Sequence, residues 1–127
     1  MANFPRLRPN PPPAHGTASR EWFRRTLGHR EYVLRQTVID PGGSSGWHYH
    51  DGTLLVLVTR GTLDHPDARL TPIRYPRFRV FREPSGPRHP HVARNSGPGP
   101  VTIWVLYRNP PGAPLSQHIE PLDSGGC

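Results

Sequence analysis

Histidines gather at two places in this sequence, and their spacing suits metal binding. His48 and His50 stand two residues apart in WHYH, and His89 and His91 do so in HPHVARN. Because side chains alternate in direction along a β-strand, His48 and His50 would project from one face of a strand. Two neutral imidazoles so placed can occupy neighbouring coordination positions of one metal ion. A third ligand is then needed, and His89 and His91 are both candidates.

Short β-type segments surround these histidines and must position them. Apolar runs end at turn signals such as Asp40-Pro41-Gly42-Gly43, and this spacing, without a convincing long helix, predicts an all-β sandwich or small antiparallel barrel. The segment 20–27 is predicted to be either a short helix or a first strand, and the segment HPHVARN a further short strand. The remaining strands are expected at 31–39, 47–50, 54–58, 79–81 and 101–107.

The length of 127 residues is typical of one compact domain. Residues 1–19 hold five prolines in their first 13 positions, which predicts a disordered arm. The barrel is expected over 20–112. Residues 113–127 are expected to form a tail, in which Ile119 and Leu122 could pack on the barrel.

Composition excludes several classes of function. The chain has 16 basic residues, 9 acidic residues and a formal net charge of +7, but the basic residues are scattered arginines, so nucleic acid is not an expected partner. No apolar run is long enough to span a bilayer and the N-terminus has no signal-peptide pattern, so we expect a cytoplasmic protein without membrane contact. The single cysteine, Cys127, permits no disulfide framework within the chain and is expected to be a free thiol.

Two segments resemble the motifs of the cupin family. GGSSGWHYHDGTLLVLVTRGTL is similar to the first motif, in which H-x-H precedes an apolar strand and a turn glycine, here Gly61. HPHVARNSG is similar to the second, with His91 and Asn95 in its His and Asn positions. The resemblance covers roughly residues 31–110 and is closest to small single-domain cupins of high-GC bacteria. It implies a small antiparallel barrel with a metal in its mouth, and homodimers are common in the family.

One position departs from the family pattern. The family places a glutamate ligand seven residues before the turn glycine, and this sequence has Leu54 there. A metal held by His48, His50 and His91 would then keep its full +2 charge, which favours an anionic ligand. The cofactor expected is a divalent ion, and imidazole ligands suit Fe(II), Ni, Mn or Zn without choosing among them.

Two functions of different class follow from this reading. The first is an enzyme acting on a small anionic or enolisable metabolite, with dioxygenase-, isomerase- or lyase-type chemistry. The second is a barrel that binds a small molecule or metal as a sensor without turnover. Candidate catalytic residues are Tyr32, Gln36 and Tyr107. Candidate substrate-binding residues are Arg77, Arg79, His89 and Arg94.

The apolar strand 54–58 is expected to be covered on both faces and to line an apolar pocket. Leu54, Val56 and Val58 would share one face. Trp47, Tyr49 and Trp104 are predicted either to form an outward-facing dimer surface or to pack beneath the N-terminal arm.

Overall fold

The fold is built from short antiparallel strands joined by turns. The structure is a computed structural model that describes residues 4–123, and these residues contain no helix. The strands are β1 (Arg8–Pro9), β2 (His15–Leu27), β3 (Arg30–Ser44), β4 (His48–Tyr49), β5 (Thr53–Arg60), β6 (Leu63–Asp64), β7 (Arg74–Tyr75), β8 (Val80–Glu83), β9 (Val101–Asn109) and β10 (Gln117–His118). The predicted all-β fold is confirmed, and the segment 20–27 is a strand.

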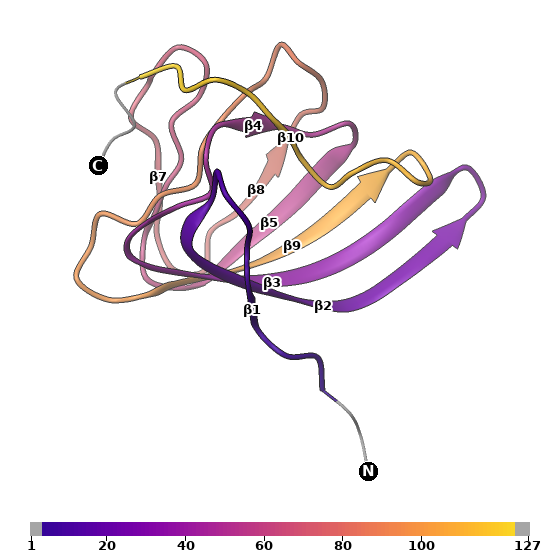
Figure 1. Cartoon of the computed structure of the whole chain (residues 1–127), viewed down its shortest axis with the longest axis horizontal. Helices are drawn as coiled ribbons and strands as arrows, with labels where there is room; N and C mark the ends of the chain where they lie inside the picture. The colour runs from indigo at the N-terminus through magenta and orange to yellow at the C-terminus, as the bar shows by residue number, and fades with distance from the viewer. Residues whose placement is uncertain (1–3, 124–127) are drawn as a thin grey trace.

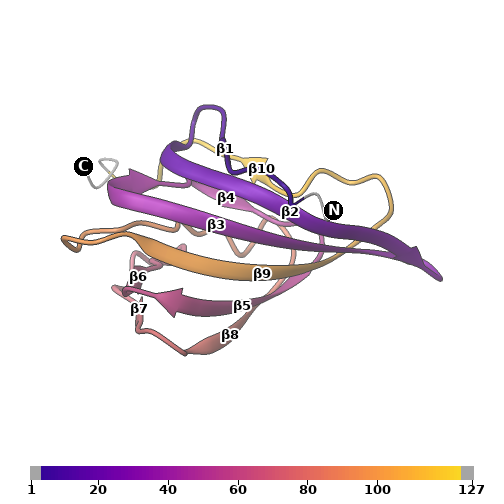
Figure 2. The same ribbon diagram turned by 90° about the horizontal axis from the view of Figure 1, so that it is seen from below.

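The larger layer is a six-stranded antiparallel sheet in the order β1-β2-β3-β9-β5-β8. The segments β3 and β9 pair from Glu31↔Asn109 to Ile39↔Val101, and β9 pairs on its other edge with β5. Figure 2 shows these long strands curving side by side. Side chains alternate in direction along β9, so every second residue points inward. The buried residues that show this are Val101, Ile103, Val105 and Tyr107.

The second layer is made of smaller pieces. Strand β4 pairs with β10, and β6 pairs with β7. The predicted strand in HPHVARN forms only isolated bridges, His48↔His91, Asp67↔His91 and two that involve Arg94. These bridges still place residues 91–94 between β4 and β6, which closes the second layer. Figure 1 shows β4 and β10 next to each other, apart from the long strands of the main sheet.

The core lies between the two layers and is lined by alternate residues of the main sheet. Leu54, Val56 and Val58 share the inner face of β5, as predicted, and pack with Val33 and Ile39 of β3. The expectation that β5 is covered on both faces is wrong. On its outer face Leu55 is 48% exposed, whereas Leu57, opposite Trp104 of β9, is half-buried.

The expectation of a disordered arm over residues 1–19 is wrong for residues 8–19. Strand β1 pairs with β2 through Arg8↔Ser19 and Pro9↔Ala18. Thr17 and Ser19 are buried, and the Asn10 side-chain amide donates to both of their hydroxyls, at 3.0 and 2.9 Å. A polar segment without an apolar pattern is thus ordered by hydrogen bonds. Residues 1–3 of the predicted arm lie outside the described residues.

The C-terminal segment crosses over β4. Strand β10 pairs with β4 through Gln117↔Tyr49 and His118↔His48. Trp47 is buried and its indole N–H donates to Asp123 at 3.1 Å, so it is not an outward-facing dimer residue. Ile119 is half-buried, whereas Leu122 is exposed. Cys127 lies outside the described residues.

Trp104 packs against a side chain of β2, so packing directly beneath the N-terminal arm is not confirmed for it. Its ring lies 5.6 Å from that of Trp22, and Phe4 of the N-terminal segment lies 5.8 Å from Trp22.

No helix in residues 4–123 is long and apolar enough to cross a membrane.

Candidate metal centre

Two glycines set the position of β4 and its histidines. Gly46 has φ +74°, a left-handed conformation that glycine adopts without strain, and its carbonyl accepts a hydrogen bond from His48 at 2.7 Å. After His50 the chain turns at Gly52, where a Cβ atom would collide with the carbonyl oxygen of Arg108 on β9. The absent side chain therefore lets the turn pack directly on the main sheet. His48 and His50 are both buried on the inner side, as the strand alternation predicts.

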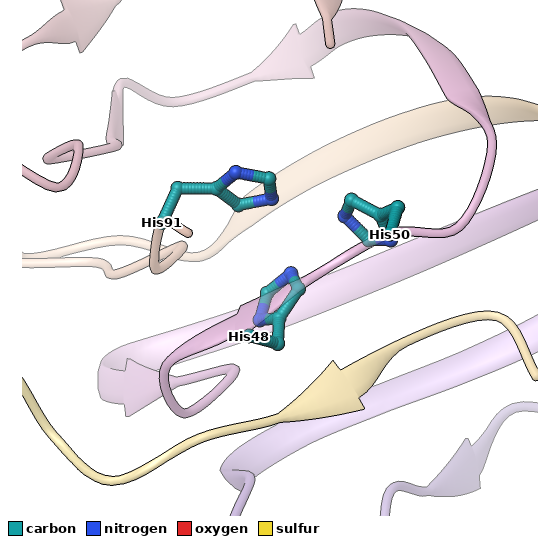
Figure 3. Close-up of side chains that lie close together, drawn as sticks. All are labelled: His48, His50 and His91. Carbon is teal, nitrogen blue, oxygen red and sulfur yellow. The ribbon is translucent and has the colours of Figure 1, made fainter. Parts of the chain in front are cut away.

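His91 joins them from the neighbouring segment. Its backbone N–H donates to the carbonyl oxygen of His48 at 2.9 Å, and the return bond from His48 N–H is 3.0 Å. The rings of His48, His50 and His91 have centroids 4.7 to 4.9 Å apart. Figure 3 shows the three side chains converging on one space. Their nitrogen atoms can offer one ligand each within 4.8 Å of one another.

Backbone carbonyls fix which ring nitrogen of each histidine is free. The Nδ1 atoms of His48, His50 and His91 lie 2.7, 2.7 and 3.1 Å from the carbonyl oxygens of Gly46, Leu115 and His89. A carbonyl oxygen only accepts, so each Nδ1 carries the proton that it donates. Each neutral ring then turns an unprotonated Nε2 inward. Metal-binding histidines are held in this tautomer by such outer hydrogen bonds.

A carboxylate stands among these histidines, which corrects the expectation of a centre without one. Glu83 Oε2 lies 3.0 Å from His50 Nε2 and 2.9 Å from His91 Nε2. Glu83 ends β8 and pairs directly with Leu54 of β5. Directly opposite residues of an antiparallel pair project from the same face. The carboxylate that the family pattern places at position 54 is therefore supplied from the facing position on the adjacent strand.

Sequence reasoning missed Glu83, although a signal for it was present. Phe81 was expected in the interior, and in a strand the residue two positions later shares its face. Glu83 lies at that position. A buried acidic residue at the inward end of a strand needs a cation or hydrogen-bond donors, and its placement should have marked it as a ligand candidate.

His65 is a second residue that sequence reasoning missed. Its Nε2 lies 2.8 Å from Glu83 Oε1, and its ring stacks on that of His91 with centroids 4.7 Å apart. His65, Glu83 and His91 form a second overlapping group of potential ligands. The buried Leu63 lies two residues before His65, so the same alternation predicts an inward imidazole.

The cluster fits a divalent cation. His50 Nε2, His91 Nε2 and Glu83 Oε2 are buried and have no hydrogen-bond partner, so lone pairs face one another. Two ligand atoms at right angles, each about 2.1 Å from one ion, are about 3.0 Å apart. The observed separations of 2.9 and 3.0 Å agree with that spacing. A shared cation would thus satisfy three buried groups at once. With Glu83 bound, such an ion would carry a net charge of +1 rather than +2.

The pKa directions match this picture. Burial by itself would raise the pKa of Glu83, but the charge of His65, together with its hydrogen bond to the other carboxylate oxygen, leads the influences that outweigh burial and hold that pKa well below its ordinary value. Burial, then repulsion from His50 and His91, holds the pKa of His48 well below its ordinary value. The structure therefore favours an ionised Glu83 beside a neutral His48, the forms that bind a metal.

A cavity of about 290 Å³ opens beside the cluster. His48, His50 and Glu83 line one part of it, and the apolar side chains of β9 line another. The predicted catalytic residue Tyr107 also lines it, with its ring 5.9 Å from that of His50. Burial raises the pKa of Tyr107, so its hydroxyl stays protonated at neutral pH.

The other predicted catalytic residues lie outside this cavity. Tyr32 and Gln36 occupy alternate positions of β3 that face away from the core, next to the inward-facing Val33. The Tyr32 hydroxyl accepts from Arg108, and the Gln36 side-chain oxygen accepts from Trp22. Strand alternation places both side chains on the outer face of β3. The sequence alone could not assign that face, because it depends on the register between the strands.

The structure also does not bring the predicted substrate-binding residues to the cavity. Arg77 and Arg79 are exposed in the segment before β8, and the Arg77 guanidinium lies over the Phe78 ring. His89 is exposed and contributes its carbonyl oxygen to His91. Arg94 forms two hydrogen bonds of 2.9 Å to Asp123 on the outside of the second layer.

Comparisons with known proteins identify the fold. The sequence matches no protein family model and no curated protein. A cupin-like protein from Thermotoga maritima is 15% identical, with a TM-score of 0.77 over 99% of this chain and 94% of that chain. The polyketide cyclase RemF from Streptomyces resistomycificus is 17% identical, with a TM-score of 0.74 over 92% and 81% of the two chains.

A third solved structure shares the fold at a somewhat higher identity than these two. It is a sugar phosphate isomerase of the cupin superfamily from Silicibacter pomeroyi, 24% identical, with a TM-score of 0.62 over 76% of this chain and 61% of that chain. At these identities the likeness concerns the fold. Together with the two-layered strand order and the inward histidines of β4, it shows that this chain has the all-β cupin fold and is consistent with a small cupin.

Proposed function

We propose that the protein is a divalent-metal-dependent enzyme acting on a small enolisable or anionic metabolite, through isomerase- or lyase-type chemistry. The ligands would be His48, His50, His91 and Glu83. The observation that supports this most is the set of buried Nε2 and Oε2 atoms that face one another without partners. Bound there, the metal would act as a Lewis acid that polarises a carbonyl or hydroxyl oxygen of the substrate.

The chain offers groups that can handle protons next to this centre. The Tyr107 hydroxyl lines the cavity and, being protonated, can donate to a substrate oxygen as negative charge develops on it. His118 of β10 also lines the cavity, with its ring 5.8 Å from that of His48. An imidazole with this access can take up a proton from a substrate carbon. An acid and a base are therefore available to an enolisation step.

The names of the structural neighbours agree with this class of chemistry. They include a polyketide cyclase, a predicted oxalate decarboxylase, DMSP lyases and a sugar phosphate isomerase. Each of these names describes chemistry on a small oxygen-containing molecule. Because the reactions in these names differ from one another, they support a general class of chemistry. The individual substrate of this chain must be identified by experiment.

Exchange of carbon-bound hydrogen with solvent tests the proposal without knowledge of the final product. The protein, loaded in turn with Fe(II), Ni, Mn or Zn, is incubated in D₂O with 1,3-diketones, 2-hydroxy acids and keto sugars, and proton NMR follows deuterium uptake. We expect exchange with at least one metal and substrate class. Oxygen consumption with Fe(II) in the same panel tests the dioxygenase-type reaction.

The variant His91→Ala serves as the control because it removes one ligand from the cluster. Exchange in the wild type that disappears in His91→Ala would support the proposal. Exchange of equal rate in both proteins, or no exchange and no oxygen uptake with any metal, would contradict an enzyme at this centre. In the latter case, metal binding alone would favour the sensor function.

A further inference from the structure

An arginine side chain lies inside the barrel, where sequence patterns did not place one. Arg35 stands on the inward face of β3, directly opposite Val105 of β9, and lines the cavity beside the metal centre. Its Nη2 donates to the Asn10 side-chain oxygen at 2.8 Å, and its Nη1 lies 3.4 Å from the Tyr107 hydroxyl. The N-terminal segment therefore holds the guanidinium toward the cavity.

The charge of Arg35 is not balanced by a neighbouring carboxylate. Within residues 4–123, no acidic side chain forms an ion pair with it. Glu21 faces Arg35 across the β2–β3 pair, but its carboxylate pairs with Arg24 at 2.7 Å. A half-buried cation with only neutral partners favours an anion that enters its site.

Guanidinium geometry narrows the class of anion. Arginine presents five N–H donors, and the two contacts to Asn10 and Tyr107 leave others free for a planar acceptor. A carboxylate matches that fork with two parallel hydrogen bonds. The Tyr107 hydroxyl accepts from this fork, which leaves its one O–H proton for the second oxygen of the ligand.

The cavity connects this arginine with the metal centre. Arg35 contacts Tyr107, and the ring of Tyr107 lies 5.9 Å from that of His50. Between the two polar ends, Leu54, Ile103, Val105 and Leu115 line the cavity with apolar surface. Its 290 Å³ would hold about ten water molecules at roughly 30 Å³ each, which limits the ligand to a small molecule.

We propose that the cavity binds an organic acid whose carboxylate pairs with Arg35, whose carbon body lies on the apolar wall and whose second oxygen reaches the metal centre. The position of the second oxygen rests on the proposed function. The carboxylate subsite stands on Arg35, Asn10 and Tyr107, none of which is a proposed metal ligand. The substrate class is thus a small carboxylic acid with a carbonyl or hydroxyl group at a distance from its carboxylate.

Matched acid and amide pairs test the carboxylate subsite. Isothermal titration calorimetry measures binding of 4-oxopentanoate and 4-oxopentanamide, and of benzoate and benzamide, to metal-free and zinc-loaded protein. We expect the acids to bind wild-type protein at least tenfold more tightly than their amides. Arg35→Gln should abolish this preference, Arg35→Lys should retain part of it, and the exposed Arg60→Gln should leave it unchanged.

The two proposals fail in different ways. Metal content measured on the same samples tests the centre, whereas the acid preference of the metal-free protein tests Arg35 independently. Arg35→Gln should keep the metal content of the wild type, which also shows that the variant is folded. An absence of acid preference across all pairs, or a preference that persists in Arg35→Gln, would overturn the subsite.

Discussion

The proposed chemistry of this protein depends on a few buried atoms whose lone pairs face one another. His50 and His91 are oriented by carbonyl oxygens on their outer side, so their inner nitrogens have no proton to give to Glu83. A divalent ion would satisfy all three groups, and the backbone carbonyls that contact the outer nitrogens already orient both histidine rings toward it.

Replacement of Glu83 should therefore weaken metal binding while preserving the shape of the site. Glu83→Gln removes the negative charge, and we expect it to lower zinc affinity by about 100-fold or more. Loss of a residue that only hydrogen-bonds to a metal ligand lowers metal affinity by up to about 100-fold, and loss of a direct ligand should lower it at least as much. Competition with a chromogenic chelator measures the affinity. The exposed Glu120→Gln is the matched control, since Glu120 lies outside the cavity. Equal affinities in Glu83→Gln and the wild type would show that Glu83 is not a ligand.

The metal-free protein should lose stability in acid, in two stages. The pKa of His48 is held below its ordinary 6.5, so as pH falls through that value the unfolded chain takes up a proton that the folded state resists. The pKa of Glu83 is held below its ordinary 4.5, so its contribution is present above that pH and is lost as pH falls further. Urea unfolding should give midpoints that decrease from pH 7 to pH 5 because of His48, and decrease again below pH 4.5 because of Glu83. Midpoints that stay constant or rise in the first range would contradict the pKa direction of His48, and in the second range that of Glu83.

At the scale of elements, the pairing of β5 with β8 determines which strand supplies the carboxylate. Leu54 and Glu83 face each other on the inner side of this pair. A glutamate at either of these two positions should therefore place its carboxylate at the same metal centre. Exchange of the two residues provides a direct test of the register.

We expect Glu83→Leu to lose zinc affinity and the double variant Leu54→Glu, Glu83→Leu to regain most of it. Leu55 points outward from the same strand, so the double variant Leu55→Glu, Glu83→Leu is the matched control and should not regain affinity. Chelator competition reports all three variants. Recovery in the Leu55 control, or none in the Leu54 variant, would contradict the observed register.

Local patterns in the sequence predicted the convergence of three histidines and five of the strands, β3, β4, β5, β8 and β9, but not β1, β6, β7 or β10. The H-x-H spacing and the later His91 depend on strand alternation and on family motifs, both of which are readable along the chain. Glu83, His65 and Arg35 reach the site through pairing between distant strands, and the register of that pairing is not a local property. Strand alternation within residues 79–83 could have predicted from the sequence that Glu83 faces inward. The position of Asn10 over Arg35 instead depends on how the N-terminal segment folds back.

At the scale of the molecule, the distribution of charge matters more than its net value of +7. Arg77 and Arg79 lie in solvent, and Arg94 is paired with Asp123, so these charges do not act in the cavity. Inside the barrel, Glu83 would offset part of the charge of a bound metal, and Arg35 adds a positive charge to the same cavity. The selectivity for an anion is thus expected from one inward arginine.

The homodimer that the family resemblance implies stays a prediction, and the outer face of the main sheet is the surface where we expect it. Phe23, Leu34, Leu106 and Leu55 lie in register across four strands there, and Phe23 and Leu55 are 45% and 48% exposed. Sedimentation equilibrium should give a dimer for the wild type and a monomer for Leu55→Asp. A monomeric wild type, or a dimer unaffected by Leu55→Asp, would contradict this surface.

The most direct test of the metal centre is elemental analysis of protein purified without a histidine tag. Samples reconstituted with Fe(II), Ni, Mn or Zn and then desalted should contain one bound divalent ion per chain for at least one metal. The variants His50→Ala and His91→Ala should contain little, whereas His29→Ala, at the exposed β2–β3 turn, should match the wild type. A wild type that retains none of these metals, or equal metal in all variants, would contradict a centre built from His48, His50, His91 and Glu83.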